Sequence, residues 1–220
     1  MNPLSRPCPR LLLLTAFALA LPGGWNAASA ATLGAFQISA RGDQKLNLST
    51  GQTELPQGGT ATDSKNGLTL TGKTLKYLPG QSLQATGAAV RVAAGGTLTA
   101  DTVNYDVKSG TLTASGHLNY TSARIRSLSA GNAVLYTAAG AVVASGNVRA
   151  VSPALSASRV VVLKGGAQIL LAGNYTLKTG SSRLADPSAS ARLLLNTKGG
   201  QSVTPRPTQA ALRAFVPYLK

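Results

Sequence analysis

The chain of 220 residues is strongly basic although few of its residues are charged, since 21 lysines and arginines stand against only 6 acids. It contains one cysteine and one histidine, which excludes a disulfide framework and the usual zinc sites, and we expect no metal and no cofactor. The length fits one domain with a substantial core.

The first 30 residues have the pattern of a secretory signal peptide. Arg6 and Arg10 form a basic start, an apolar stretch follows, and small residues at 28–30 provide a cleavage site. The apolar stretch is too short to span a bilayer, although an uncleaved anchor is the alternative. Cleavage after Ala30 leaves 190 residues and removes the only cysteine, Cys8.

The mature chain keeps a large positive charge. Without Arg6 and Arg10 the basic residues number 19 against 6 acids, a formal charge of +13. Such a charge favours binding to polyanions, phosphorylated glycolipid head groups or acidic membrane surfaces, and simple solubility is the alternative explanation. We expect no binding to nucleic acid, because the basic residues are not interleaved with aromatic residues.

The chain after residue 30 consists of alternating strands and turns. Alternation of apolar and polar residues within 36–48 predicts an opening pair of strands, and the polar segment 50–66 is a connection or an irregular hairpin. From Thr97 to Ser122 the sequence predicts a hairpin, with a turn at 107–110 and clean alternation in its second strand.

This hairpin is one unit of a repeat, and a glycine inside the second strand marks each copy. The glycines Gly87, Gly116, Gly146 and Gly173 are spaced 29, 30 and 27 residues apart. Apolar residues recur at fixed offsets, four and two positions before each glycine, as at Leu83 and Ala85, and two positions after it at Ala89, Leu118, Val148 and Tyr175. We expect all of them on one face of their strands. Such self-similarity predicts stacked units that share one core. The glycines either help the sheet curl or line a ligand slot.

The end of the chain differs from the repeats. Residues 190–196 contain a closing strand, and Pro205 and Pro207 disfavour any strand beyond it. We expect a β domain over 31–198 and a tail over 199–220 that is poorly ordered, or serves as a cap or a docking segment.

No catalytic constellation is found. The single histidine, His117, falls on the polar face of its strand, and no carboxylate is expected to orient it. Asp101 and Asp106, the closest acids, are separated by an odd spacing that sends them to opposite faces unless a bulge intervenes. We therefore expect the protein not to be an enzyme.

The sequence resembles a known family. The phrases LTADTVNYDVKSGTLTASGHLNY and SLSAGNAVLYTAAGAVVASGNV resemble the OstA-like domain of lipopolysaccharide-transport proteins over roughly residues 36 to 196. The segment 144–148 matches the family's glycine motif, and Ala100-Asp101 matches its alanine-plus-acid motif. Gly131-Asn132 and Ser158-Arg159 depart from that second motif.

The resemblance implies an all-β fold, in which repeated β-hairpins form a twisted, folded-over β-jelly roll of roughly 10 to 14 strands. It also implies a location in the periplasm, in association with the cell envelope, and an apolar groove between sheets that holds acyl chains. The groove-facing candidates are Leu112, Ala114, Gly116, Leu118, Val142, Ala144, Gly146, Val148, Ile169, Leu171, Gly173 and Tyr175. The same positions could equally pack on one another as an ordinary core.

The implied function is non-enzymatic carriage of lipopolysaccharide, or of a similar anionic amphiphile, to the outer membrane. The implied partners are homologous domains of the LptC and LptD kind, joined through sheet edges, and a head-to-tail homo-oligomer is a further expectation. The alternative is a structural envelope protein that binds acidic polymers electrostatically, which ionic strength would distinguish from acyl-chain binding.

Overall fold

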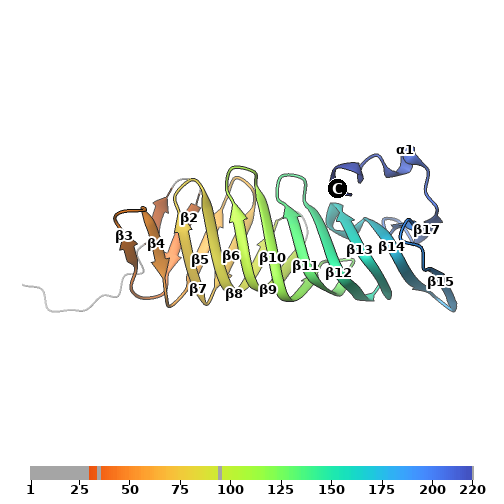
Figure 1. The fold of residues 1–220 in the computed structure, drawn as a ribbon, viewed down its shortest axis with the longest axis horizontal. Helices are drawn as coiled ribbons and strands as arrows, with labels where there is room; N and C mark the ends of the chain where they lie inside the picture. Colours follow the sequence, from red (N-terminus) through yellow and green to blue (C-terminus); the bar gives the residue numbers. More distant parts are fainter. Residues whose placement is uncertain (1–29, 34–35, 94–95, 220) are drawn as a thin grey trace, which may run out of the picture.

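The computed structural model describes residues 30–33, 36–93 and 96–219, which form an elongated body with strands running across its long axis (Figure 1). The described residues contain 17 antiparallel strands in one sheet. The first strands are short: β1 (Ala30–Leu33), β2 (Phe36–Ala40), β3 (Lys45–Asn47), β4 (Gln52–Leu55), β5 (Gly59–Asp63), β6 (Leu68–Gly72) and β7 (Thr74–Leu78).

The central strands are longer, and shorter elements follow them to the C-terminus. The long strands are β8 (Ser82–Val92), β9 (Gly96–Asp106), β10 (Thr111–Thr121), β11 (Arg126–Tyr136), β12 (Ala141–Ser152), β13 (Leu155–Leu163) and β14 (Gln168–Thr179). The elements that follow are β15 (Ser182–Asp186), β16 (Arg192–Asn196), β17 (Ser202–Pro205), helix α1 (Gln209–Leu212) and the 3₁₀ turn η2 (Val216–Tyr218).

The sheet is folded over along a crease that crosses the middle of the long strands. At the crease the pairing registers shift, for example between Ser115 and Leu118 of β10 and between Ser145 and Val148 of β12. The glycines that mark the sequence repeat lie there with left-handed backbone angles, φ 74° at Gly116. A side chain is strained at this φ, so glycine permits the bulge that bends each strand.

The crease divides the sheet into two layers that face each other. One layer, which we call the β7 layer, contains β3, β4, β7, β16, β17 and the halves of the long strands that meet at the turns 107–110, 137–140 and 164–167. The other, the β6 layer, contains β1, β2, β5, β6, β15 and the remaining halves. Strand β8 pairs with β7 before Gly87 and with β6 after it, and β14 divides in the same way between β16 and β15.

One apolar core fills the space between the layers from Phe36 to Leu195. Phe36 of the β6 layer contacts Tyr105 of the β7 layer edge to face, with ring centroids 5.5 Å apart. Inward side chains alternate along each strand, as at Leu112, Ala114, Leu118 and Tyr120. The predicted all-β, folded-over architecture built from hairpin repeats is therefore confirmed.

Two details of the predicted fold were wrong. The strands outnumber the expected 10 to 14, because the segments before Ser82 and after Thr179 form separate short strands on either side of the crease. Ala89 does not share the inner face with Leu83 and Ala85; it is exposed, and Ala88 is buried in its place. Two successive residues, Thr86 and Gly87, face outward at the crease and shift the alternation by one.

The C-terminal segment packs on the outside of the sheet. Strand β17 pairs with β16 as far as Pro205, so the sheet continues past residue 198. The chain then turns back over the body, where Phe215 is completely buried against Val161, Leu170 and Leu194 (Figure 1). The β7 layer is thus apolar on both faces at this end of the molecule.

A Gly173→Ala substitution is expected to destabilise the protein more than Gly80→Ala. Both glycines have left-handed φ, 77° and 68°, which costs an alanine about 1 kcal/mol. A Cβ at Gly173 would also lie 2.9 Å from Ser158, whereas nothing lies within 4 Å of one at Gly80. Overpacking adds about 1 kcal/mol or more at the crease. Urea unfolding of both variants measures the difference, and equal losses would contradict a crowded crease.

Candidate functional site

The predicted lipid-contacting residues lie on three alternate strands, β10, β12 and β14, with β11 and β13 between them. Their nine larger side chains belong to the core between the layers, and all are at most 5% exposed: Leu112, Ala114, Leu118, Val142, Ala144, Val148, Ile169, Leu171 and Tyr175. The three glycines lie at the crease and differ from these side chains. Gly173 is buried, Gly116 is half-buried, and Gly146 is exposed.

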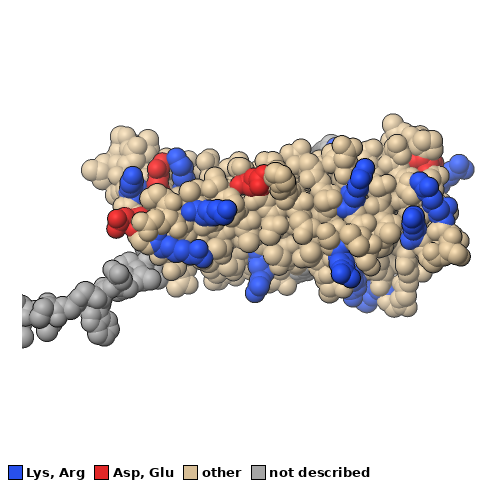
Figure 2. Space-filling view, turned by 90° about the horizontal axis from the view of Figure 1, so that it is seen from below, with Lys and Arg blue, Asp and Glu red and all other residues tan. Residues whose placement is uncertain are grey.

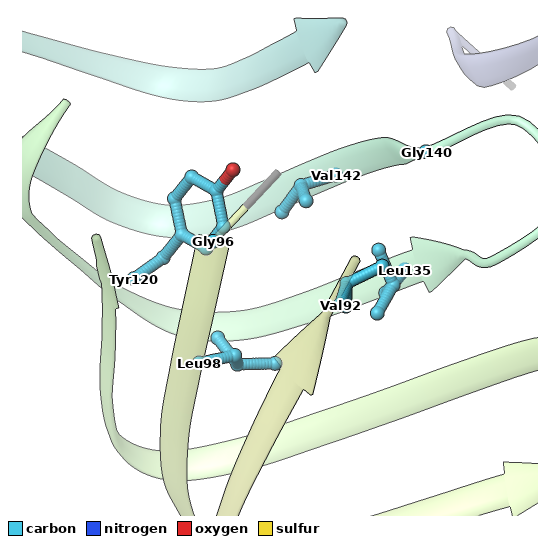
Figure 3. Close-up of a pocket in the computed structure, with 7 residues that line it drawn as sticks. All are labelled: Val92, Gly96, Leu98, Tyr120, Leu135, Gly140 and Val142. Atoms are coloured by element: carbon cyan, nitrogen blue, oxygen red, sulfur yellow. The ribbon is translucent and has the colours of Figure 1, made fainter. Parts of the chain in front are cut away.

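The space between the layers is closed. Its free volume near the turns is about 10 Å³, where Val92, Leu98 and Tyr120 of the β6 layer face Leu135 and Val142 of the β7 layer (Figure 3). That is room for about one water molecule. The candidate residues thus pack on one another in this conformation, and an acyl chain requires the layers to separate.

Full burial changes what a polar substitution at Leu118 or Val148 would do. Both side chains are at most 2% exposed, so a polar replacement leaves an unsatisfied group in the core and costs about 2 to 5 kcal/mol. We therefore expect a polar substitution at either position to destabilise the fold, whatever its effect on lipid binding. A test of lipid binding has to act on the boundary between the layers instead.

That boundary is a seam opposite the crease, where the turns of one layer meet the turns of the other. One contact across it joins Tyr105 of β9 to Asp63 of β5, with the Tyr105 hydroxyl donating to Asp63 Oδ2 at 3.2 Å. Asn66 Nδ2 donates to the same carboxylate at 2.7 Å and to the Tyr105 hydroxyl at 3.2 Å. Burial raises the pKa of Tyr105, so its hydroxyl stays protonated and remains a donor.

A second contact across the seam lies towards the C-terminal end. Ser122 Oγ, after β10, donates to the backbone oxygen of Gly165, between β13 and β14, at 3.2 Å. Ile125, in the same turn as Ser122, is fully buried in the core beside it. The small gap near Tyr120 and Val142 lies between these two polar contacts in the order of strands. The layers are therefore joined covalently through the crease and only by non-covalent contacts at the seam.

The outer side of the crease carries an ion pair that the sequence interpretation missed. His117 Nδ1 lies 2.6 Å from Asp101 Oδ2, although no carboxylate was expected to orient this histidine. The bulges at Gly116 and between Ala100 and Val103 bring the two together, and they also place Asp101 on the same exposed face as Asp106. Both partners are more than half exposed, as in an ordinary ion pair on a protein surface.

Among the described residues, no three histidine, cysteine, aspartate or glutamate side chains come together as a metal site would require. No helix in the described part of the chain is long and apolar enough to cross a membrane.

Comparisons with known proteins give a likeness to solved structures but no sequence relative. No protein-family model matches the chain, and no curated protein does. Among solved structures, the chain is similar to LptH of Pseudomonas aeruginosa, described as the LptA-homologous periplasmic component of the lipopolysaccharide transport device. The identity is 12%, the alignment covers 80% of this chain and 96% of that one, and the TM-score is 0.38.

The His117–Asp101 pair predicts a measurable titration. The hydrogen bond and the charge of Asp101 raise the pKa of His117 above its usual value of 6.5. Because the folded-state pKa is raised, the pair contributes stability below pH 6.5 and loses it as the pH rises through the raised pKa. An NMR titration of the imidazole should show a higher pKa than in the Asp101→Asn variant. The same pKa in both proteins would contradict the ion pair.

Proposed function

We propose that this protein is a non-enzymatic, periplasmic carrier that holds the acyl chains of an anionic amphiphile, such as lipopolysaccharide, between its two layers. The observation that carries the proposal is the seam, because a single apolar core lies behind a boundary without covalent links. The resemblance to the OstA-like domain, on the repeat phrases that contain Gly116 and Gly146, supports the same function.

Burial of an acyl chain offers more free energy than the hydrogen bonds across the seam contribute, so opening of the seam is feasible. The hydrogen bond from Tyr105 to the Asp63 carboxylate contributes about 1.5 to 3 kcal/mol net, and the neutral one from Ser122 about 0.5 to 1.5 kcal/mol. An acyl chain gains about 0.8 kcal/mol for each methylene group that leaves water. A chain of about twelve carbons therefore offers close to 10 kcal/mol. It also covers the apolar faces that separate from one another, so the separated layers do not stay exposed.

The candidate residues have suitable positions for this role. Leu112, Val142 and Ile169 lie at the same offset before their glycines and face the core from alternate strands, with Leu135 and Val162 in register between them. They form an apolar row that runs along the long axis of the body. A chain inserted through the seam would lie against such rows in both layers.

The strand edges at the two ends of the body are suited to end-to-end pairing with other domains of this kind. At the N-terminal end β1 and β3 each pair with one neighbour within the described residues, and at the C-terminal end β15 and β17 do the same. Each end therefore presents one strand edge from each layer. Backbone pairing between the C-terminal end of one domain and the N-terminal end of the next would join the two apolar cores. The partners would be another copy or a homologous domain.

Native mass spectrometry of the protein purified gently from its own envelope tests this function. We expect a fraction of the protein to carry an acylated molecule of defined mass that survives raised salt, since burial of acyl chains is not screened. Protein without an acylated ligand, which also takes up none at high salt, would contradict the carrier function.

A further inference from the structure

The net positive charge of this protein is concentrated in its C-terminal half. After Asp106 the sequence has 13 lysines and arginines and a single acid, Asp186. Between residues 31 and 106 it has 6 basic residues and 5 acids. On the face seen in Figure 2, blue side chains lie over both halves of the body, whereas red side chains lie mainly over the left-hand half. Solubility alone does not require such an uneven distribution.

Within the basic half, the outer face of the β6 layer is hollowed into a shallow trough of about 570 Å³. It lies over β11 to β14 and is lined by four hydroxyl side chains and two cations: Ser127, Ser129, Arg149, Ser156, Thr176 and Lys178. The rest of its lining is apolar and consists of Ala150, Val151, Ala154 and Leu155, of which Val151 is 63% exposed. Ala150 and Leu155 belong to the apolar core between the layers, so the trough borders that core.

The strand register sets polar side chains in a row across this trough. Ser129 is opposite Arg149, Arg149 opposite Ser156, and Ser156 opposite Thr176. Neighbouring strands are about 4.8 Å apart, so the row presents a polar group at each such step along the body. Lys178 lies two residues beyond Thr176 on β14 and projects from the same face, with Arg183 of β15 directly opposite it.

Among the described residues, no ion pair joins Arg149 or Lys178 to an acid. The single acid of this half, Asp186, is opposite Tyr175, whose side chain faces the core, and accepts a hydrogen bond from the Ser188 backbone N–H. Arg149 and Lys178 are therefore available to an external oxyanion, to which they donate charge-assisted hydrogen bonds.

We propose that this trough binds an anionic saccharide, with Arg149 and Lys178 on its phosphate or carboxylate and the row of serine and threonine hydroxyls on its sugar hydroxyls. Cations on two strands fix the anionic group, hydroxyls at regular spacing match a polyhydroxylated ligand, and Val151 offers an apolar surface to a sugar ring. The proposal does not depend on lipid carriage, because a saccharide without acyl chains is sufficient to occupy the trough.

NMR titration with glucose 1-phosphate, glucuronate and uncharged glucose tests the site. We expect saturable shifts of the Ser129, Ser156 and Thr176 amides with the two anionic sugars and none with glucose. An Arg149→Gln/Lys178→Gln variant should lose affinity by about tenfold or more. The control variant Lys45→Gln/Arg91→Gln removes equal charge from exposed sites in the other half and should change affinity less than about twofold.

Equal losses in the two variants, or shifts spread over all basic residues, would overturn the proposal, since they would indicate attraction by net charge alone. Competition identifies the source of the saccharide. Displacement of glucose 1-phosphate by phosphatidylinositol vesicles indicates a lipid head group, and displacement by hyaluronate oligosaccharides indicates a soluble acidic chain. Either displacement supports the site, and displacement by neither contradicts it. Failure here would leave acyl-chain binding, measured separately by mass spectrometry, unaffected.

Discussion

The backbone bulge at the crease is the constraint on which the rest of the structure depends. A strand of eleven residues cannot fold back over its neighbours while it keeps a regular ladder, so each repeat places a glycine where φ has to be positive. Gly116 and Gly173 are crowded by Asp101 and Ser158, which leaves no room for a Cβ. Because the crease fixes both halves of every strand, it determines which side chains face the core and where the opposite boundary falls.

The seam follows from the crease, since a sheet folded once has one continuous side and one side where turns meet. Every inter-strand hydrogen bond of the ladder lies within a layer, and the polar contacts across the seam at Tyr105 and Ser122 are few. Separation of the layers therefore costs mainly apolar packing, which an acyl chain can replace. This asymmetry is the basis of the proposed carriage of an acyl chain between the layers.

Much of the fold could be predicted from local pattern, because alternation and turn glycines act over a few residues. The hairpin of residues 97–122, the repeat and the all-β architecture are examples. Ala89 was misplaced because alternation was extended through a crease that breaks it. The His117–Asp101 pair, the Asp63–Tyr105 contact and the trough beside Arg149 depend on register between strands, to which a single sequence gives no direct access. Lipid contact by the buried candidates stays a prediction.

The central claim is that an acyl chain enters between the layers through the seam. A disulfide across the seam, which can be oxidised and reduced, tests this claim most directly. A Cβ at Gly166 would lie 3.1 Å from that of Arg124 across the seam. This is shorter than the separation of about 3.5 to 4.5 Å in a disulfide, so the two turns have to move slightly apart for the bond to form. The expected signal peptide holds the only native cysteine. In the Arg124→Cys/Gly166→Cys variant of the mature chain, uptake of a fluorescent fatty acid should be blocked when oxidised and restored by reduction, with Gly166→Cys alone as control. Equal uptake by the oxidised and reduced forms, once mass spectrometry verifies the disulfide, would contradict access through the seam.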